Sequence, residues 1–248
     1  RKLEGFEDLS DDDRRALDGL APHIRQVAAR VALGREGDEP ENAHLLLDGL
    51  ASRYKMLPDG KRQSMALRGP GHFCRRNVFI LDQMDHNIAT ISACHVVDIP
   101  RRAIEEITQA HPQITRAFWW CGLVDEAVLR EWLVNLGGRA PERRIAHFLC
   151  EMLVRLDAVG KVTNDSYAFP FTQVELADAM GLSAVHVHRT LRELRDLGLI
   201  TIKRRVLTIH DVEQLKSFSG FTPNYLHLKN TRWGARRSEP WLNQLRES

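Results

Sequence analysis

Residues 171–200, FTQVELADAMGLSAVHVHRTLRELRDLGLI, carry the most informative pattern in the sequence. It predicts a helix, a tight turn and a second helix. Thr172 and Glu175 have the spacing of a capping box that begins the first helix. Gly181 permits the turn, and Ser183 caps the second helix. The predicted inward-facing residues are Val174, Leu176, Ala177 and Met180 in the first helix and Val187, Leu191, Leu194 and Leu197 in the second.

The outward positions of the second helix are rich in hydrogen-bond donors. They are His186, His188, Arg189, Arg192 and Arg195. Gly198 ends this helix, and two short strands follow at Leu199–Lys203 and Val206–Ile209, joined through a basic turn. This order of elements predicts a winged helix-turn-helix with a basic wing. The alternative interpretation, two helices packed within a core, leaves the donor-rich face and the wing unexplained.

The second helix has the features of a DNA-reading helix. In the major groove an arginine can bind guanine O6 and N7 through two hydrogen bonds, and Arg189 is the best placed candidate. His186 and His188 lie within one turn of it and could reach bases or phosphates; each could instead be an exposed histidine without a partner. Hydroxyl and amide groups at helix N-termini suit phosphate oxygens. The predicted DNA-binding residues are Thr172, Gln173, Ser183, His186, His188, Arg189, Arg192, Lys203, Arg204 and Arg205.

The charge is unevenly distributed along the chain. The 248 residues carry 35 Lys and Arg against 33 Asp and Glu, a net charge of +2 that gives no hint of a nucleic-acid partner. Residues 1–138 hold 18 basic and 21 acidic side chains, net −3, whereas residues 139–248 hold 17 and 12, net +5. A basic half that contains the helix-turn-helix fits phosphate binding, although charge alone could equally mark a solvated surface.

The first half of the chain changes from a short helix to a β region. Ser10 caps an acidic helix over 10–20, and strands are expected at 24–32, 43–57, 64–67 and 88–99. Pro58, Asp59 and Gly60 predict a hairpin turn, because Pro presets the first turn φ and Gly supplies a positive φ. Several hairpins in about 90 residues predict a small antiparallel roll or barrel.

A long helix is expected over 114–136, after Pro112, and another over 141–156. In the long helix, apolar residues recur three and four apart, a seam that can pack on its own domain or on a second copy of the chain. We favour a dimer seam that also contacts the roll. The predicted dimer residues are Ile114, Ala117, Phe118, Cys121, Val124 and Val128.

Other classes of protein find little support. The four cysteines are widely spaced, with no Cys-x-x-Cys pair, so we expect buried free thiols rather than a zinc site, with a reactive sensor thiol as the alternative. No phosphate loop, Gly-x-Ser-x-Gly or His-Glu-x-x-His motif is present, and we expect no catalytic residues, no metal and no cofactor. No apolar run approaches the roughly 18 residues of a membrane span, and the first residues do not form a signal peptide, which predicts a cytoplasmic protein without a membrane partner.

The order of these motifs resembles the Crp/Fnr family of bacterial transcription regulators. Residues 46–63 and 69–73 look like the family's cyclic-nucleotide-type β-roll, 114–136 like its dimerisation helix, and 172–200 like its DNA-reading unit. The resemblance implies an α+β fold divided into residues 1–112, 113–138, 139–217 and a C-terminal extension, 218–248. It also implies a homodimer that binds double-stranded DNA at a near-palindromic promoter site, with half-sites about one helical turn apart, and that contacts RNA polymerase.

The sequence departs from the family pattern in the roll. In members that bind cyclic nucleotides a Gly-Glu step holds the ribose and an Arg-Ser/Thr-Ala step holds the phosphate. Here His72 follows Gly71, and the second step is either 84–86 or 87–89, without an Arg. Asp85 would repel a cyclic phosphate, so we predict no tight binding of cyclic AMP. A different effector pocket would draw on His72, Arg75, Arg76, Asp85 and His86; Arg75 and Arg76 could hold another anion or be surface residues.

A second departure lies in the recognition helix. Many members place a Glu four residues before the guanine-reading Arg, and Val185 holds that position here. Val185 offers only methyl contacts, for example to thymine, so we expect a different operator sequence. A separate hypothesis makes the roll a sensor of haem, a thiol oxidant or a metabolite that gates DNA binding.

Overall fold

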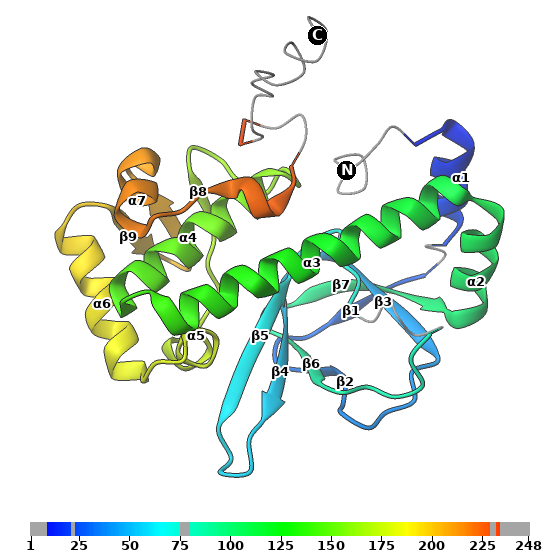
Figure 1. Cartoon of the computed structure of the whole chain (residues 1–248), viewed down its shortest axis with the longest axis horizontal. Coiled ribbons are helices and arrows are strands. Elements are labelled where there is room, and N and C mark those ends of the chain that lie inside the picture. The colour runs from blue at the N-terminus through cyan, green and yellow to red at the C-terminus, as the bar shows by residue number, and fades with distance from the viewer. Residues whose placement is uncertain (1–8, 21–22, 75–79, 229–231, 234–248) are drawn as a thin grey trace, which may run out of the picture.

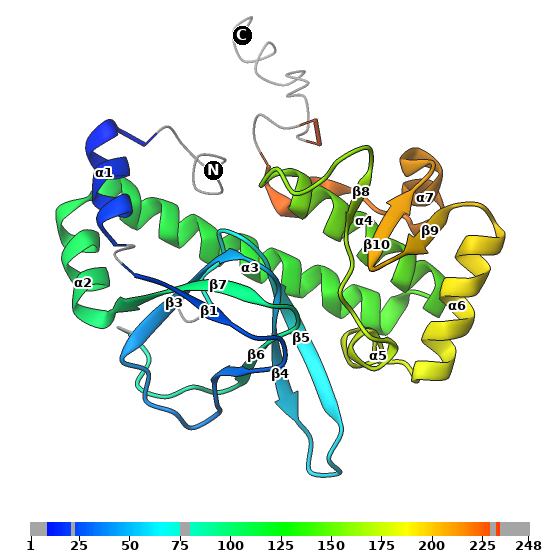
Figure 2. The same cartoon turned by 180° about the vertical axis from the view of Figure 1, so that it is seen from behind.

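The computed structural model of the chain describes residues 9–20, 23–74, 80–228 and 232–233. Figure 1 shows a β-roll on one flank of a long diagonal helix and a winged helix domain around one end of that helix. Seen from behind in Figure 2, the roll and the winged domain lie on the same helix, side by side. The fold is α+β, as the sequence predicts.

The roll consists of two antiparallel sheets with strand orders β1-β7-β3 and β2-β6-β4-β5. Three of the expected strands are each divided into two. Between β3 and β4 the break falls at Gly49, whose φ is +86° and whose missing Cβ would lie 2.3 Å from the carbonyl oxygen of Ala93. The strands are β1 (Ile24–Val27), β2 (Ala32–Gly34), β3 (Asn42–Asp48), β4 (Ala51–Met56), β5 (Arg62–Arg68), β6 (Asn87–Thr90) and β7 (Cys94–Pro100).

The predicted hairpin at residues 58–60 is present. It joins β4 to β5, with Met56 paired to Arg62 next to the turn. The hairpin extends from the roll and stands beside the winged domain in both views (Figures 1 and 2). This places a roll element next to the DNA-reading unit.

Helices lie along one side of the roll and continue the chain (Figures 1 and 2). Helix α1 (Asp11–Gly19) has the expected N-cap at Ser10, which the structure shows to form a capping box with Asp13. Helix α2 (Arg101–Ala110) leads into α3 (Pro112–Gly138). At about 1.5 Å per residue the 27 residues of α3 span about 40 Å. Helix α4 (Pro141–Asp157) then turns back and begins the winged domain.

The burial of α3 corrects the predicted dimer seam. All six predicted residues, Ile114, Ala117, Phe118, Cys121, Val124 and Val128, are at least nine-tenths buried within the single chain. Phe118 meets Phe73 of the roll edge to face, with ring centroids 5.2 Å apart. The spacing identified the apolar face of the helix correctly, but periodicity does not distinguish the chain's own roll from a partner. The apolar side chains of α3 that face solvent are Trp119 (72% exposed), Leu123, Leu129, Leu133 (71%) and Val134.

The winged domain has its own sheet and shares a core with the end of α3. Its elements are β8 (Ser166–Ala168), α5 (Gln173–Met180), α6 (Ala184–Asp196), β9 (Ile200–Lys203), β10 (Val206–Ile209), α7 (Val212–Ser219) and the 3-10 helix η3 (Pro223–Leu226). The sheet order is β8-β10-β9; the sequence had not indicated β8. Phe221, Tyr225 and Leu226 lie in the same core cluster as Trp132 of α3, so this part of the 218–248 extension packs on the domain.

Candidate nucleic-acid interface

The helix-turn-helix forms as its local sequence predicts. The Thr172 hydroxyl accepts from the Glu175 backbone N–H at 3.2 Å while a Glu175 carboxylate oxygen accepts from the Thr172 N–H at 2.7 Å. Gly181 ends α5 in the left-handed region at φ 62°, and the Ser183 hydroxyl accepts from the His186 N–H. These bonds satisfy backbone N–H groups at the first turns of both helices.

Two predicted inner residues face outward instead. Val174 is 57% exposed and Leu197 61% exposed, whereas the other six predicted inner positions are buried. Val174 lies in the first turn of α5, and Leu197 is the C-cap of α6. At helix ends the neighbouring elements no longer cover the full apolar face, which is why the pattern fails at these two positions.

The outward face of α6 presents cations held only loosely. Arg189 Nε lies 3.7 Å from Glu193, and Arg192 Nε lies 3.6 Å from Asp196, with all four side chains largely exposed. Exposed pairs of this kind at i,i+4 contribute about 0.3–0.5 kcal/mol. Exchanging a carboxylate for a phosphate or a guanine edge therefore costs little, and both arginines are available to DNA.

Arg195 differs from its neighbours on α6. Its Nε donates to the Leu191 carbonyl at 3.1 Å, so the side chain folds back on the helix. It borders a hollow of about 220 Å³ between α6 and the wing. Gln173, His188 and Arg205 line the same hollow, so three elements bring predicted DNA-binding residues together there.

The wing is a tight hairpin with basic residues at its tip. Lys203 pairs with Val206, which leaves Arg204 and Arg205 as a two-residue loop with φ of 49° and 60°. A loop with positive φ at both positions is the type I′ geometry that favours Asn-Gly, and arginine there is strained. Residues kept in strained conformations often serve function, and here the strain places two arginines at the tip of the wing.

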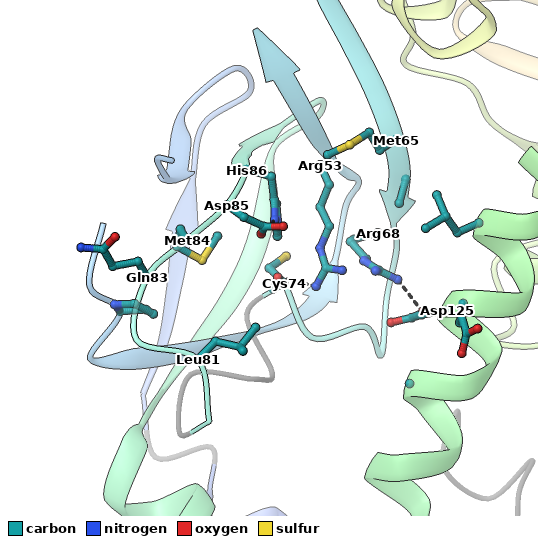
Figure 3. A pocket seen from close by; sticks show the side chains of 15 residues that line it. Arg53, Met65, Arg68, Cys74, Leu81, Gln83, Met84, Asp85, His86 and Asp125 are labelled. Atoms are coloured by element: carbon teal, nitrogen blue, oxygen red, sulfur yellow. Dashed lines mark hydrogen bonds and ion pairs between the residues drawn. The ribbon is translucent and has the colours of Figure 1, made fainter. Parts of the chain in front are cut away.

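A second site lies in the roll, where a pocket of about 390 Å³ opens between the roll and α3 (Figure 3). Of the predicted effector residues, Asp85 and His86 line it. Their contact at 2.5 Å lowers the pKa of Asp85, and burial lowers the pKa of His86. His72 lies elsewhere, beside Arg155 of α4, with Nε2 3.4 Å from the guanidinium. Arg75 and Arg76 are outside the described residues.

The main cations of this pocket are residues that sequence reasoning missed. Arg68, nearly fully buried, forms an ion pair with Asp125 of α3 at 2.5 Å, and Arg53 donates to the Cys74 carbonyl at 2.8 Å (Figure 3). The Nε of Arg68 has no hydrogen-bond partner in the described part of the chain. A basic residue that ends an otherwise apolar strand, as in Met65-Ala66-Leu67-Arg68, was the available signal for Arg68.

The four cysteines are free and buried, as predicted. Burial raises the pKa of the Cys94 thiol to about 11 and that of Cys150 to about 12. Thiols with such pKa values are protonated at neutral pH and react slowly, which disfavours a sensor role for these two.

Among the described residues, no three His, Cys, Asp or Glu side chains gather as metal ligands. In the same part of the chain, no helix is long and apolar enough to cross a membrane.

Comparison with known protein families matches both halves of the chain. Residues 24–111 match the cyclic nucleotide-binding domain, and residues 143–218 match the Crp-like helix-turn-helix domain. The chain is 28% identical over 186 residues to the nitrogen fixation regulation protein FixK of Bradyrhizobium diazoefficiens, with 74% of this chain and 76% of that protein covered. It is 28% identical over 204 residues to the transcriptional activatory protein AadR of Rhodopseudomonas palustris, with 79% and 80% covered.

The fold agrees with solved structures. FixK2 from Bradyrhizobium japonicum superposes with a TM-score of 0.71 at 21% identity, over 79% of this chain and 96% of that one. A transcriptional regulator of the CRP family from Thermus thermophilus gives a TM-score of 0.63 at 20% identity, over 79% and 96%. Together with the matched domains and the exposed donor face of α6, these likenesses place the chain in the Crp/Fnr family of DNA-binding transcription regulators.

Proposed function

We propose that the protein works as a homodimer that reads a near-palindromic promoter site through α6 and the wing. The observation that carries this proposal is the exposed, donor-rich face of α6 beside a wing tip of two arginines. Arg189 reads a guanine, His186 and His188 reach neighbouring bases or phosphates, and the remaining predicted residues hold phosphates. The protein acts in the cytoplasm, contacts RNA polymerase from the bound promoter, and performs no catalytic step.

Dimerisation uses the exposed stripe of α3 rather than the predicted seam. Trp119, Leu123 and Leu133 are exposed, and Glu126 and Arg130 form an ion pair between them along the helix. The positions 119, 123, 126, 130 and 133 alternate steps of four and three, which is the spacing of a coiled-coil seam. A second α3 packed on this stripe covers apolar surface that water would otherwise contact.

Selection of bound fragments from random DNA tests this function directly. Wild-type protein is expected to enrich one near-palindrome, and Arg189→Ala should lose about 1–3 kcal/mol on that site and relax selection at one base pair. Arg102→Ala, an exposed residue of α2, serves as the charge-matched control and should leave binding unchanged. If Arg189→Ala binds the selected site as tightly and as selectively as the wild type, the docking proposed for α6 is wrong.

The roll pocket favours a second role, in which an effector gates DNA binding. Arg53 and Arg68 give the pocket a cationic side, while Asp85 and Asp125 supply carboxylates. The Asp85 carboxylate disfavours a cyclic phosphate, and Arg68 is already paired with Asp125, so cyclic AMP is not the controlling ligand. Mass and absorbance spectra of the purified protein would show a retained metabolite or haem if this role holds, and calorimetric titration with cyclic AMP should show no tight binding.

A further inference from the structure

The first helix of the helix-turn-helix is bonded to the roll at two acidic residues. Glu175 accepts from Arg30 Nε at 3.2 Å, next to the capping box that it also forms. Asp178 forms an ion pair with Arg62 at 2.7 Å, and its backbone carbonyl accepts from the Gln63 amide at 2.9 Å. Residues three apart share one face of a helix, so a single face of α5 is directed to the roll.

The opposite sides of α5 are held by helices of the core. Leu176, Ala179 and Met180 are buried in the domain core, and Arg144 of α4 donates to the Met180 carbonyl at 2.6 Å. A Cβ on Gly181 would lie 3.2 Å from Leu136 of α3. Helix α5 therefore lies between the roll on one side and α3 and α4 on the other. A short turn joins it to α6, so its position sets where α6 begins.

The contact with the roll is narrow. Beside it a hollow of about 700 Å³ separates the hairpin residues Met56 and Leu57 from Val174 of α5 and Ala184 of α6. Both side chains of the Arg62–Asp178 pair are partly buried, which limits screening by salt. Helix α4 contacts the roll through a shared apolar cluster and the bond from Arg155 to the Leu67 carbonyl, whereas α5 is bonded to the roll by these few polar contacts. The open space beside α5 gives this helix room to rotate when those contacts break.

We propose that Arg62 of the roll is a positioning residue for DNA reading, acting through Asp178 to set the half-site spacing that the dimer accepts. This inference rests on the proposed dimeric DNA-binding function. Two recognition helices must enter major grooves about one helical turn apart, so a small rotation of α5 and α6 about α4 changes which spacing fits. The Arg68–Asp125 pair holds the roll against α3. The Arg62–Asp178 pair then holds α5 against the roll, so the position of α5 relative to α3 depends on it.

A spacing series tests the proposal. The half-sites selected by the wild-type protein are joined by spacers one or two base pairs shorter and longer than the selected one, and affinities are measured by fluorescence anisotropy. Wild type should prefer one spacer strongly. Arg62→Ala and Asp178→Asn should each reduce that preference by about fivefold, the order of a single coupled contact, while affinity for a lone half-site stays the same.

Rescue and control variants separate positioning from loss of structure. The exchange Arg62→Asp with Asp178→Arg rebuilds the pair in reverse and should restore the spacer preference. Lys55→Ala removes another roll ion pair, with Glu36, that does not touch the winged domain, and should change nothing. Asp178→Asn leaves every hairpin residue in place, including Arg62 over the Tyr54 ring, so its effect is expected to arise at α5.

The outcomes are distinct. If wild type selects no palindrome, the proposed function itself fails. If wild type prefers one spacer and both single variants keep that preference, the positioning role is wrong while the function stands. Higher affinity of both variants for every spacer would also overturn the proposal, because the contact would then restrain the reading unit rather than align it.

Discussion

The hydroxyl of Tyr225 donates to the carboxylate of Glu151 at 2.9 Å, in the interior where α3, α4 and η3 meet. Glu151 is fully buried and also accepts from the indole of Trp132 and from Arg155. Burial, and then the nearby Glu151 charge, raise the pKa of Tyr225 well above its usual value, which keeps the hydroxyl a donor at all physiological pH. The C-terminal extension thereby completes the bonding of a charge buried beneath the DNA-reading domain.

Tyr225→Phe should lower the free energy of unfolding by about 1–3 kcal/mol, because it removes a donor from a buried carboxylate. Urea unfolding followed by circular dichroism measures the loss. Tyr54→Phe is the matched control, since its ring stays beneath Arg62. Equal stabilities of the two variants would show that the Tyr225 hydroxyl contributes nothing to the fold.

Replacing the wing tip should separate stability from DNA binding. The double variant Arg204→Asn with Arg205→Gly places residues suited to positive φ in the loop. Its free energy of unfolding should therefore rise by about 1 kcal/mol. The same variant loses two cations, so the slope of log affinity against log salt should fall by as much as about 2. The control, Arg204→Lys with Arg205→Lys, keeps both charges and should keep the wild-type salt slope. If the Asn-Gly variant also keeps that slope, the wing does not contact phosphate.

Leu133→Asp should yield a folded monomer that binds the palindromic site weakly. The side chain is exposed in the single chain, so a carboxylate costs little there, whereas it would be desolvated against a partner helix. Sedimentation equilibrium gives the oligomeric state. Val31→Asp, an exposed apolar residue of the roll, should remain dimeric. A dimeric Leu133→Asp protein would argue against the exposed stripe of α3 as the interface.

Asp125→Asn should destabilise the protein by about 3 kcal/mol, because it leaves the buried Arg68 guanidinium without its charge partner. The double change Arg68→Met with Asp125→Leu removes both charges and should recover most of that loss. Chemical denaturation of the three proteins measures the difference. A fully stable single variant would mean that solvent, rather than Asp125, stabilises Arg68.

His147 should add a pH dependence to stability. Burial, and then the Arg139 charge, lower its pKa to about 3, even though a Glu131 oxygen lies 3.2 Å from Nε2. The unfolded chain takes up this proton near pH 6.5 and the folded chain does not, so stability is complete above pH 6.5 and declines as the pH falls toward 3.

The decline attributable to this histidine should approach about 1.4 kcal/mol per pH unit within that window. His147→Gln should remove this contribution, which is seen by comparing the slopes of unfolding free energy between pH 6.5 and 4 in variant and wild type. His188→Gln, at an exposed position on α6, is the matched control for the loss of a histidine. If the unfolding free energy of wild type, His147→Gln and His188→Gln changes with pH at the same rate, the low pKa of His147 is contradicted.

The sequence identifies elements whose signals are local. The N-cap at Ser10 and the capping box at Thr172 involve residues three apart, and the turn at residues 58–60 depends on the backbone preferences of Pro and Gly. Such features depend on neighbours within one helical turn or one hairpin, so a linear reading finds them. The short strand β8 has no such signal, because its three residues become a strand only by pairing with β10.

Local patterns in the chain were enough to predict the family, the α+β order of elements and the residues on the outward face of α6. Which surface each apolar face covers, and which charges meet, follows from the folded chain. Helical periodicity shows that Ile114 and Val124 share a face with one another, but only the folded roll shows that this face is internal. Likewise Arg62 and Asp178 lie 116 residues apart, and their contact exists because the backbone brings the hairpin to α5, a relationship that no local pattern encodes.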